Sequence, residues 1–353
     1  MDGKTGGWMN FQALLHSFRG RAPWRSVISP YLKSLGFHVG RGIDASIGDI
    51  VSQGYAQDQV AAIRGMLVEN LVAGEKSLRV FKVGQRDMPR LRNWAQNKRA
   101  VQNPLTAAFP GIASSSNVRA HVDGVLHYVG PLTFDGGVAA VFTSVRSYLE
   151  RVPLGADSLR PSVTDTYEKI YGQKRHFVQT YDAIYVPARG RYVYLLADYP
   201  ANTPSDFFVN SQSGLELFLR RNVDDHEILS LWPVVEGLYL ANDGSFVEHG
   251  FQTDGDSVKN HKSRRGSKDL RQDDFFKAGR EKIEQDGKDL VSYRIATRWA
   301  VRHSASLTTH PELMLPGTVG MWTKGEPLED AVIRGCLGMR DLDFVLSKIS
   351  SHL

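Results

Sequence analysis

The side chains from Val291 to His303 alternate between two kinds, and this pattern constrains the fold more than any other stretch of the chain. Successive residues of a β-strand point to opposite faces, so the alternation predicts a strand with one buried face between Leu290 and Leu307. A helix would group only some of the apolar positions, and β-branched and aromatic residues favour a strand. The face expected to be buried carries Val291, Tyr293, Ile295, Thr297, Trp299, Val301 and His303.

The opposite face of this predicted strand carries Arg294, Arg298 and Arg302, with no carboxylate among them. Neighbouring arginines would be about 13 Å apart, from a rise of roughly 3.3 Å per residue. Guanidinium groups at such intervals bind anions and do not catalyse a reaction by themselves. The strand therefore predicts a binding surface.

A second basic feature precedes this strand in the polar segment Thr253–Gln272, which we expect to be a solvated loop. Asp269 is the only acid among its closely spaced basic residues. Together with the arginine strand, this loop predicts a clamp on a polyanion. An equally weighted alternative is a surface loop beside arginines that pair with carboxylates of neighbouring strands. The basic residues of the loop are Lys259, His261, Lys262, Arg264, Arg265, Lys268 and Arg271.

A third basic segment follows Met88 and is expected to be helical, with Trp94 between its cations. Such a helix can follow phosphates and stack a base on its aromatic ring. The favoured alternative is a solvated helix that Trp94 and Leu91 anchor to a core. The cations that we assign to a nucleic-acid surface here are Arg90, Arg92, Lys98 and Arg99.

The length of 353 residues suggests about two domains. Residues 1–102 are expected to form a mainly helical domain, in which Ile47–Ser52, Gln57–Ala73 and Leu78–Val83 give the helix, helix and strand order of a winged helix-turn-helix module. Ordinary helix packing explains the same order, and Asp58 at the start of the second helix would repel phosphate. Residues 103–117 are rich in Pro, Gly and Ser and predict a linker.

Residues 118–353 are expected to form an α+β domain with an antiparallel sheet. Phe177–Tyr199 predicts a hairpin around a Pro-Ala-Arg-Gly turn, and Val234–Leu240 predicts a second one with Ser245–Phe251. Expected helices include Val138–Glu150, Leu328–Ile333 and Leu342–Ile349.

Composition excludes several classes of protein. The single Cys336 excludes an intrachain disulfide and a cysteine-based zinc site. No run approaches the roughly 18 apolar residues of a membrane span, and no secretory signal is evident. The net charge of +5 permits an anionic partner. We therefore expect a soluble, cytoplasmic protein without a membrane partner.

Catalytic motifs are weak. Asp254 and Asp256 form the best metal candidate, since two carboxylates so placed can share a divalent cation, as in some transferases. An acidic turn with glycine is far commoner, and no glycine motif that cradles phosphate opens a helix. We assign no catalytic residue, metal ligand or cofactor.

These features predict a non-enzymatic protein that binds nucleic acid by largely sequence-independent phosphate contacts. Two alternatives remain. In one, the chain is an assembly or scaffold subunit of a viral or mobile-element particle, and its arginines meet acidic faces of neighbouring copies. In the other, it is a metal-dependent transferase that uses the Asp-Gly-Asp pair.

Overall fold

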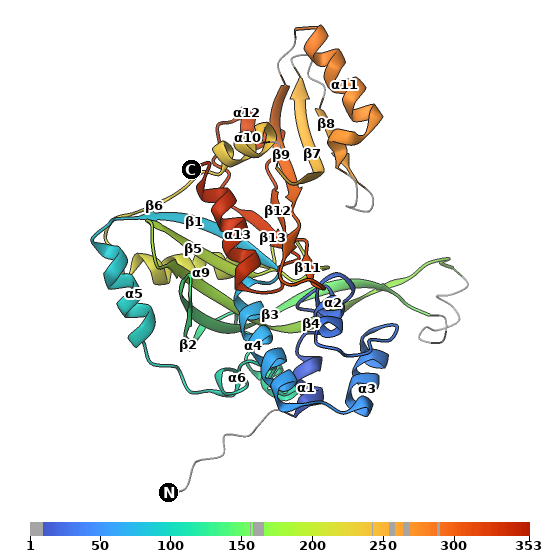
Figure 1. The fold of residues 1–353 in the computed structure, drawn as a ribbon, viewed down its shortest axis with the longest axis vertical. Helices are drawn as coiled ribbons and strands as arrows, with labels where there is room; N and C mark the ends of the chain where they lie inside the picture. Colours follow the sequence, from blue (N-terminus) through green and yellow to red (C-terminus); the bar gives the residue numbers. More distant parts are fainter. Residues whose placement is uncertain are drawn as a thin grey trace, which may run out of the picture.

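The computed structural model describes residues 10–155, 157, 166–241, 243–253, 258–263, 269–287 and 290–353. The chain has an α+β fold built on an 11-stranded antiparallel sheet, as the sequence predicts (Figure 1). The strand order is β2-β3-β4-β5-β1-β13-β12-β9-β7-β8, and β6 also pairs with β1. Because β1 lies between β5 and β13, which are far from it in the sequence, one sheet joins segments from nearly the whole chain.

The sheet contains β1 (Lys76–Val83), β2 (His127–Phe134), β3 (Gly137–Pro153), β4 (Tyr171–Pro187), β5 (Tyr192–Asp198), β6 (His226–Ile228), β7 (Ser245–Thr253), β8 (Val258–Lys262), β9 (Leu290–Arg298), β12 (Glu312–Leu315) and β13 (Ala331–Arg334). A separate two-stranded sheet contains β10 (Val301–Arg302) and β11 (Thr308–Thr309).

Helices cover both faces of the sheet. Residues of α4 (Gln57–Ala73), α10 (Trp232–Leu240) and α13 (Met339–Ser350) share one apolar core with the sheet. The opposite core is formed with α5 (Asp87–Asn97) and α9 (Val209–Arg220). With both faces covered, the central strands carry apolar residues on both sides, as in β1, where Val80 and Phe81 enter opposite cores.

The N-terminal part is helical. It contains α1 (Phe11–His16), the π-helical turn η1 (Trp24–Ile28), α2 (Ser29–Ser34), α3 (Ile43–Gln53) and α4. These elements enclose a third core together with Leu307 and Leu337. The expected helix over Gln57–Ala73 is confirmed. The next strand, β1, is a central strand between β5 and β13 and does not form a separate two-stranded wing.

The segment 103–117 contains α6 (Pro104–Ala107) and the start of α7 (Ser115–Ala120). Leu105 is fully buried there and packs with Val118 and Val145 of β3. The division of the chain at this segment stays a prediction about folding units, since β1, which precedes it, lies inside the common sheet.

Three predicted elements have the wrong secondary structure, and the expected loop Thr253–Gln272 contains strand β8 and the 3-10 turn Leu270–Gln272. Val138–Glu150 was expected to be helical and belongs to strand β3, because its first ten residues are buried on both faces and show no alternation. Val234–Leu240 was expected to be a strand and lies in helix α10, with Pro233 in its first turn. Leu328–Ile333 was expected to be helical, and Ala331–Arg334 is strand β13. Short apolar runs fit both the helical and the strand periodicity, so burial in the folded protein decides between a helix and a strand.

The expected long strand between Leu290 and Leu307 is divided. β9 ends at Arg298, and Val301 and Arg302 belong to the separate sheet with β11. The hairpin Phe177–Tyr199 is confirmed by the antiparallel pairing of β4 with β5. The helix at Leu342–Ile349 is also confirmed, within α13.

The remaining helical elements are η3 (Leu270–Gln272), α11 (Asp274–Gln285) and α12 (Val319–Thr323). Among the described helices, none has the length and apolar content that crossing a lipid bilayer requires.

The strands β3 and β4 extend beyond the sheet as a two-stranded ribbon (Figure 1). β2 pairs with β3 only as far as Thr143, and β5 pairs with β4 only from Ala183 onward, whereas β3 and β4 pair with each other as far as Pro153 and Tyr171. The ribbon, defined as residues 144–153 and 171–180, therefore has no other strand beside it in the described chain.

Candidate functional site

The arginines of the predicted binding strand have partners inside the chain. Arg294 Nε donates to Glu248 Oε1 at 2.5 Å, and Arg298 Nε donates to Glu312 Oε2 at 3.1 Å. These carboxylates belong to the neighbouring strands β7 and β12, whose adjacency the sequence does not show. Arg302 lies in the other sheet, where it is exposed and its Nε donates to the carbonyl of Ser304 at 3.2 Å.

The basic segment before β9 is also largely paired where it is described. Lys262 Nζ lies 3.0 Å from Glu248 Oε2. Burial alone would raise the pKa of Glu248, but Lys262 and Arg294 lower it below its usual value. Arg271 Nε donates to Asp269 Oδ2 at 3.0 Å, whereas Lys259 is exposed. The loop residues Arg264, Arg265 and Lys268 and the candidate metal ligands Asp254 and Asp256 lie outside the described residues.

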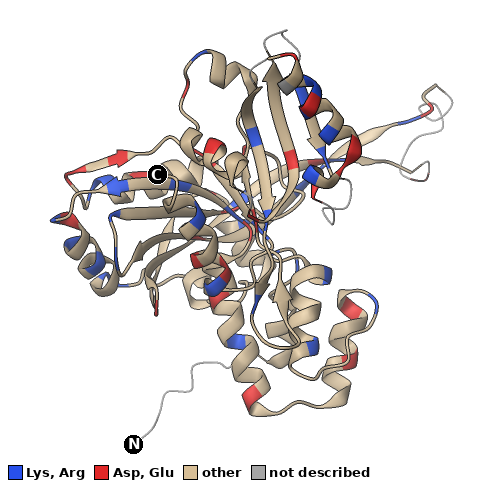
Figure 2. Cartoon of the chain, turned by 45° about the horizontal axis from the view of Figure 1, so that its top comes forward, with Lys and Arg blue, Asp and Glu red and all other residues tan. Residues whose placement is uncertain are grey.

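The basic helix α5 packs against the sheet. Arg90 NH1 donates to Asp224 Oδ2 at 3.0 Å, and Arg92 Nε donates to the carbonyl of Pro187 at 2.9 Å. Lys98 Nζ lies 5.5 Å from the ring centroid of Tyr128, Trp94 packs against a core, and Arg99 is exposed. Basic and acidic positions are interspersed along much of the described chain, including α11 (Figure 2).

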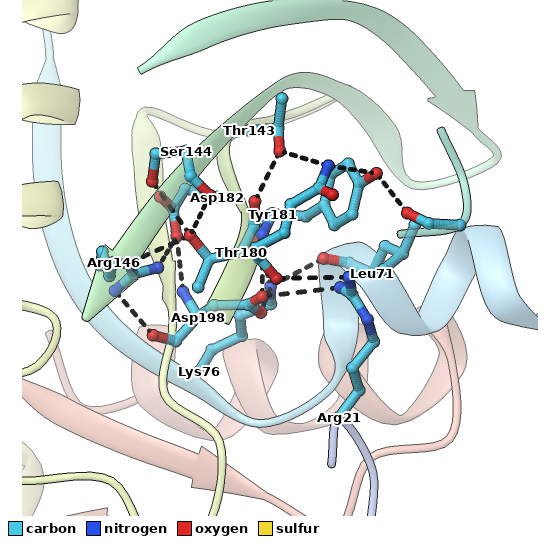
Figure 3. A network of polar contacts seen from close by, with 12 residues as sticks. Arg21, Leu71, Lys76, Thr143, Ser144, Arg146, Thr180, Tyr181, Asp182 and Asp198 are labelled. Atoms are coloured by element: carbon cyan, nitrogen blue, oxygen red, sulfur yellow. Dashed lines mark hydrogen bonds and ion pairs between the residues drawn. The ribbon is translucent and has the colours of Figure 1, made fainter. Parts of the chain in front are cut away.

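A buried ionic network lies beneath the base of the ribbon (Figure 3). Lys76 is completely buried, and its Nζ donates to the carbonyls of Leu71 and Tyr181, both at 2.7 Å, and to Asp198 Oδ1 at 2.5 Å. The other oxygen of Asp198 accepts the backbone N–H of Tyr181 at 2.8 Å. An ammonium has three donors, so Lys76 is fully satisfied, and Asp198 has a charge partner deep in the protein.

The second half of this network is centred on Arg146. Its NH2 donates to Asp182 Oδ1 at 2.7 Å, and its NH1 donates to the carbonyls of Asp198 and Phe207 at 3.0 and 3.1 Å. Burial raises the pKa of Asp182 above its usual value, although Arg146 opposes this effect. These bonds fix the backbone at Asp198 and Phe207.

Arg21 links the network to a cavity of about 580 Å³ (Figure 3). Its NH1 lies 3.9 Å from Asp198 Oδ2, and its guanidinium carbon lies 4.7 Å from the ring centroid of Tyr181. Its NH2 donates to the carbonyl of Gln179 at 3.4 Å. Only 9% of the Arg21 side chain is exposed, and its Nε and NH1 are buried without a hydrogen-bond partner among the described residues. Two donors of a buried cation are thus left for a ligand.

The rim of the cavity is basic. Arg119 comes from α7 and Arg175 from β4, and both are exposed. The Arg119 guanidinium lies 5.7 Å from the ring centroid of Phe177, and Arg175 NH1 donates to Ser147 Oγ at 3.1 Å. Among the described residues that line the cavity, the only carboxylate is that of Asp198, which Lys76 already pairs.

Two further basic side chains at the cavity have carboxylate partners. Arg19 pairs with Asp44, and His176 Nε2 lies 2.6 Å from Glu150 Oε2. The cations that remain for an anion are therefore Arg21, Arg119 and Arg175. We call this site the arginine cavity.

Sequence reasoning did not find the arginine cavity. Its three available arginines come from distant segments, and none belongs to a recognised motif, although Arg175 lies between Lys174 and His176. The pair Lys76 and Asp198 is separated by 122 positions. In the part of the chain that the structure describes, no group of three or more His, Cys, Asp and Glu side chains is arranged to hold a metal ion.

No protein-family model, curated protein or solved structure matches this chain.

Proposed function

We propose that the protein binds nucleic acid without catalysing a reaction, through phosphate contacts at the arginine cavity. One observation carries the proposal: Arg21, Arg119 and Arg175 surround one cavity, and the one carboxylate among the described residues that line it is already paired. Guanidinium groups present several donors in a planar fork that matches phosphate oxygens. Contacts of this kind position a strand but carry no sequence information, so binding would be largely independent of sequence.

The ribbon extends this basic surface away from the body of the protein. Arg151, Lys174 and Arg175 are exposed on it, and the Arg151 guanidinium lies 4.0 Å from the ring centroid of Tyr171. A projecting ribbon of this kind can follow a polyanion that starts at the cavity. On this proposal the protein acts in the cytoplasm.

Arg294 and Arg298 support the proposal less than the cavity does. Each is partly buried and already has a carboxylate partner, so a phosphate would have to displace that carboxylate. The exposed Arg302 and Lys259 stay predicted contacts.

A titration of labelled oligonucleotide by fluorescence anisotropy at several salt concentrations tests the proposal. We expect binding that weakens with salt, since each neutralised phosphate releases counterions. The double variant Arg119→Gln and Arg175→Gln should reduce the slope of log affinity against log salt by roughly 1.4 to 1.8, from about 0.7 to 0.9 per contact.

The matched control is the double variant Arg189→Gln and Arg191→Gln. These exposed arginines lie in and just after the turn between β4 and β5, at the opposite end of β4 from the ribbon tip. The control should retain the wild-type slope. Binding without salt dependence, or an equal loss in both double variants, would refute the proposal.

The alternative of an assembly subunit is favoured by a different observation. The ribbon exposes apolar side chains, with Leu149 exposed by 45% and Tyr171 by 44%. Projecting apolar ribbons suit contacts between copies of a chain. This function would be favoured by concentration-dependent oligomers that contain no nucleic acid and that dissociate in the variant Leu149→Ser.

A further inference from the structure

We infer that the arginine cavity receives the terminal phosphate of a nucleic-acid strand, which is a phosphate monoester, at its Arg21 floor. This inference rests on the proposed function for the source of the phosphate. It adds which chemical form of phosphate the cavity accepts and which atoms bind it.

The floor of the cavity offers two donors that make no hydrogen bond to the described residues. Arg21 Nε and NH1 have no hydrogen-bond partner among the described residues, and the side chain is nine-tenths buried. A buried guanidinium with unsatisfied donors is costly unless a ligand accepts from them. A phosphate oxygen is a suitable acceptor for either donor because it is charged.

The groups around Arg21 hold it in place without competing for the ligand. The side-chain amide nitrogen of Gln179 donates to the Leu105 carbonyl and the Thr143 hydroxyl, both at 3.1 Å, and its oxygen accepts from Ala113 N–H at 2.8 Å. Gln179 therefore serves Arg21 only through its backbone carbonyl. Both Asp198 oxygens accept hydrogen bonds from Lys76 and Tyr181, so its charge is already compensated when an anion enters.

The difference in burial between floor and rim selects the monoester. Arg21 and Gln179 are buried, whereas Arg119 and Arg175 at the rim are exposed. The nucleic-acid strand continues on both sides of an internal phosphodiester, so both flanking nucleotides would have to leave the buried floor of the cavity through the same opening. A terminal phosphate has one attachment, and it carries up to two negative charges at neutral pH because its second pKa is about 6.

The size of the cavity fits this ligand. Its volume of about 580 Å³ lies within the range of roughly 300 to 1,000 Å³ that small-molecule sites occupy. The terminal nucleotide can then fill the cavity while Arg119 and Arg175 contact the next phosphates of the strand.

The test compares competitor oligonucleotides of one sequence in an anisotropy assay. One ends in hydroxyl groups, one carries a 5′-phosphate and one a 3′-phosphate, and a nucleoside monophosphate is the fourth competitor. We expect at least one phosphorylated oligonucleotide to bind about tenfold or more tightly than the hydroxyl form, the factor that one charged hydrogen bond supplies. In Arg21→Gln this ratio should fall to about one.

Each outcome separates this inference from the proposed function. Equal affinity for all three oligonucleotides in the wild-type protein overturns the terminal-phosphate site and leaves nucleic-acid binding intact. No binding of any oligonucleotide overturns the proposed function. A nucleoside monophosphate that competes as well as the phosphorylated oligonucleotide keeps the monoester site and overturns the strand as its source. The wild-type ratio decides the matter even if Arg21→Gln does not fold.

Discussion

Glu75, next to the buried Lys76, should make the stability of the protein depend on pH. Its side chain is almost completely buried, Oε1 accepts the N–H of Gly335 at 2.8 Å, and Oε2 has no hydrogen-bond partner among the described residues. Burial raises the pKa of Glu75 from 4.5 to about 7. The Gly335 N–H and Arg334 oppose this change, and Glu312 and Asp198 add to it. The perturbation that we propose is Glu75→Gln.

The direction in which pH changes the free energy of unfolding follows from proton binding. Between pH 4.5 and pH 7 the folded protein holds the Glu75 proton and the unfolded chain releases it, so the free energy of unfolding falls as pH rises through this range. A pKa difference of about 2.5 corresponds to roughly 3 kcal/mol in total, most of which falls between pH 5 and pH 8. Glutamine has no proton to lose, so this dependence should disappear in the variant.

Urea denaturation at pH 5, 6, 7 and 8 measures the effect in both proteins. Taking the difference between them cancels the contributions of the other titrating groups. Relative to wild type, Glu75→Gln should gain roughly 2 to 3 kcal/mol between pH 5 and pH 8. A difference that stays constant across this range would refute the reasoning, because it would mean that Glu75 titrates alike in both states.

Three further predictions concern stability and binding. Burial lowers the pKa of His249 to about 4, so wild type should lose roughly 3 kcal/mol as pH falls from 6.5 to 4. In the same urea assay, the free energy of unfolding of His249→Phe should fall by roughly 3 kcal/mol less than that of wild type over this pH range. An equal fall in both proteins would refute this prediction. Lys76→Met should cost on the order of 3 to 5 kcal/mol because it leaves Asp198 buried without its ammonium. Lys282→Met, at the exposed pair with Asp286, should cost less than about 0.5 kcal/mol, and similar costs for the two would contradict the structural role of the network. The double variant Arg294→Gln and Arg298→Gln should bind the oligonucleotide with an affinity within about twofold of wild type. A tenfold loss would indicate that the arginines of β9 form the binding site.

The sequence predicts elements well where a single period is unambiguous. The apolar stripe of Gln57–Ala73 fits only a helix, and the two strands around Pro187 and Gly190 fit only a hairpin. The prediction of secondary structure fails where a strand is buried on both faces. The strand β3 is of this kind and lacks the alternation that identifies a half-buried strand. The position of β1 in the middle of the sheet depends on pairings with β5 and β13, far away in the chain.

The site was harder to predict than the fold class. A row of arginines on one strand face is visible in the sequence, but their partners Glu248 and Glu312 lie on other strands, and only the strand order brings them together. Arg21 shows the reverse case. Nothing around it in the sequence distinguishes it from other arginines, and its unsatisfied donors become evident only when Asp198, Tyr181 and Gln179 are placed around it.

The most direct test of the account is a crystal structure of the complete chain with a short oligonucleotide that carries a terminal phosphorothioate, whose sulfur is located by anomalous scattering. The account predicts the terminal group in the arginine cavity, with one of its oxygens about 2.7 to 2.9 Å from Arg21 Nε or NH1. An oligonucleotide bound along β9 beside Arg294 and Arg298, with no density at Arg21, would contradict it.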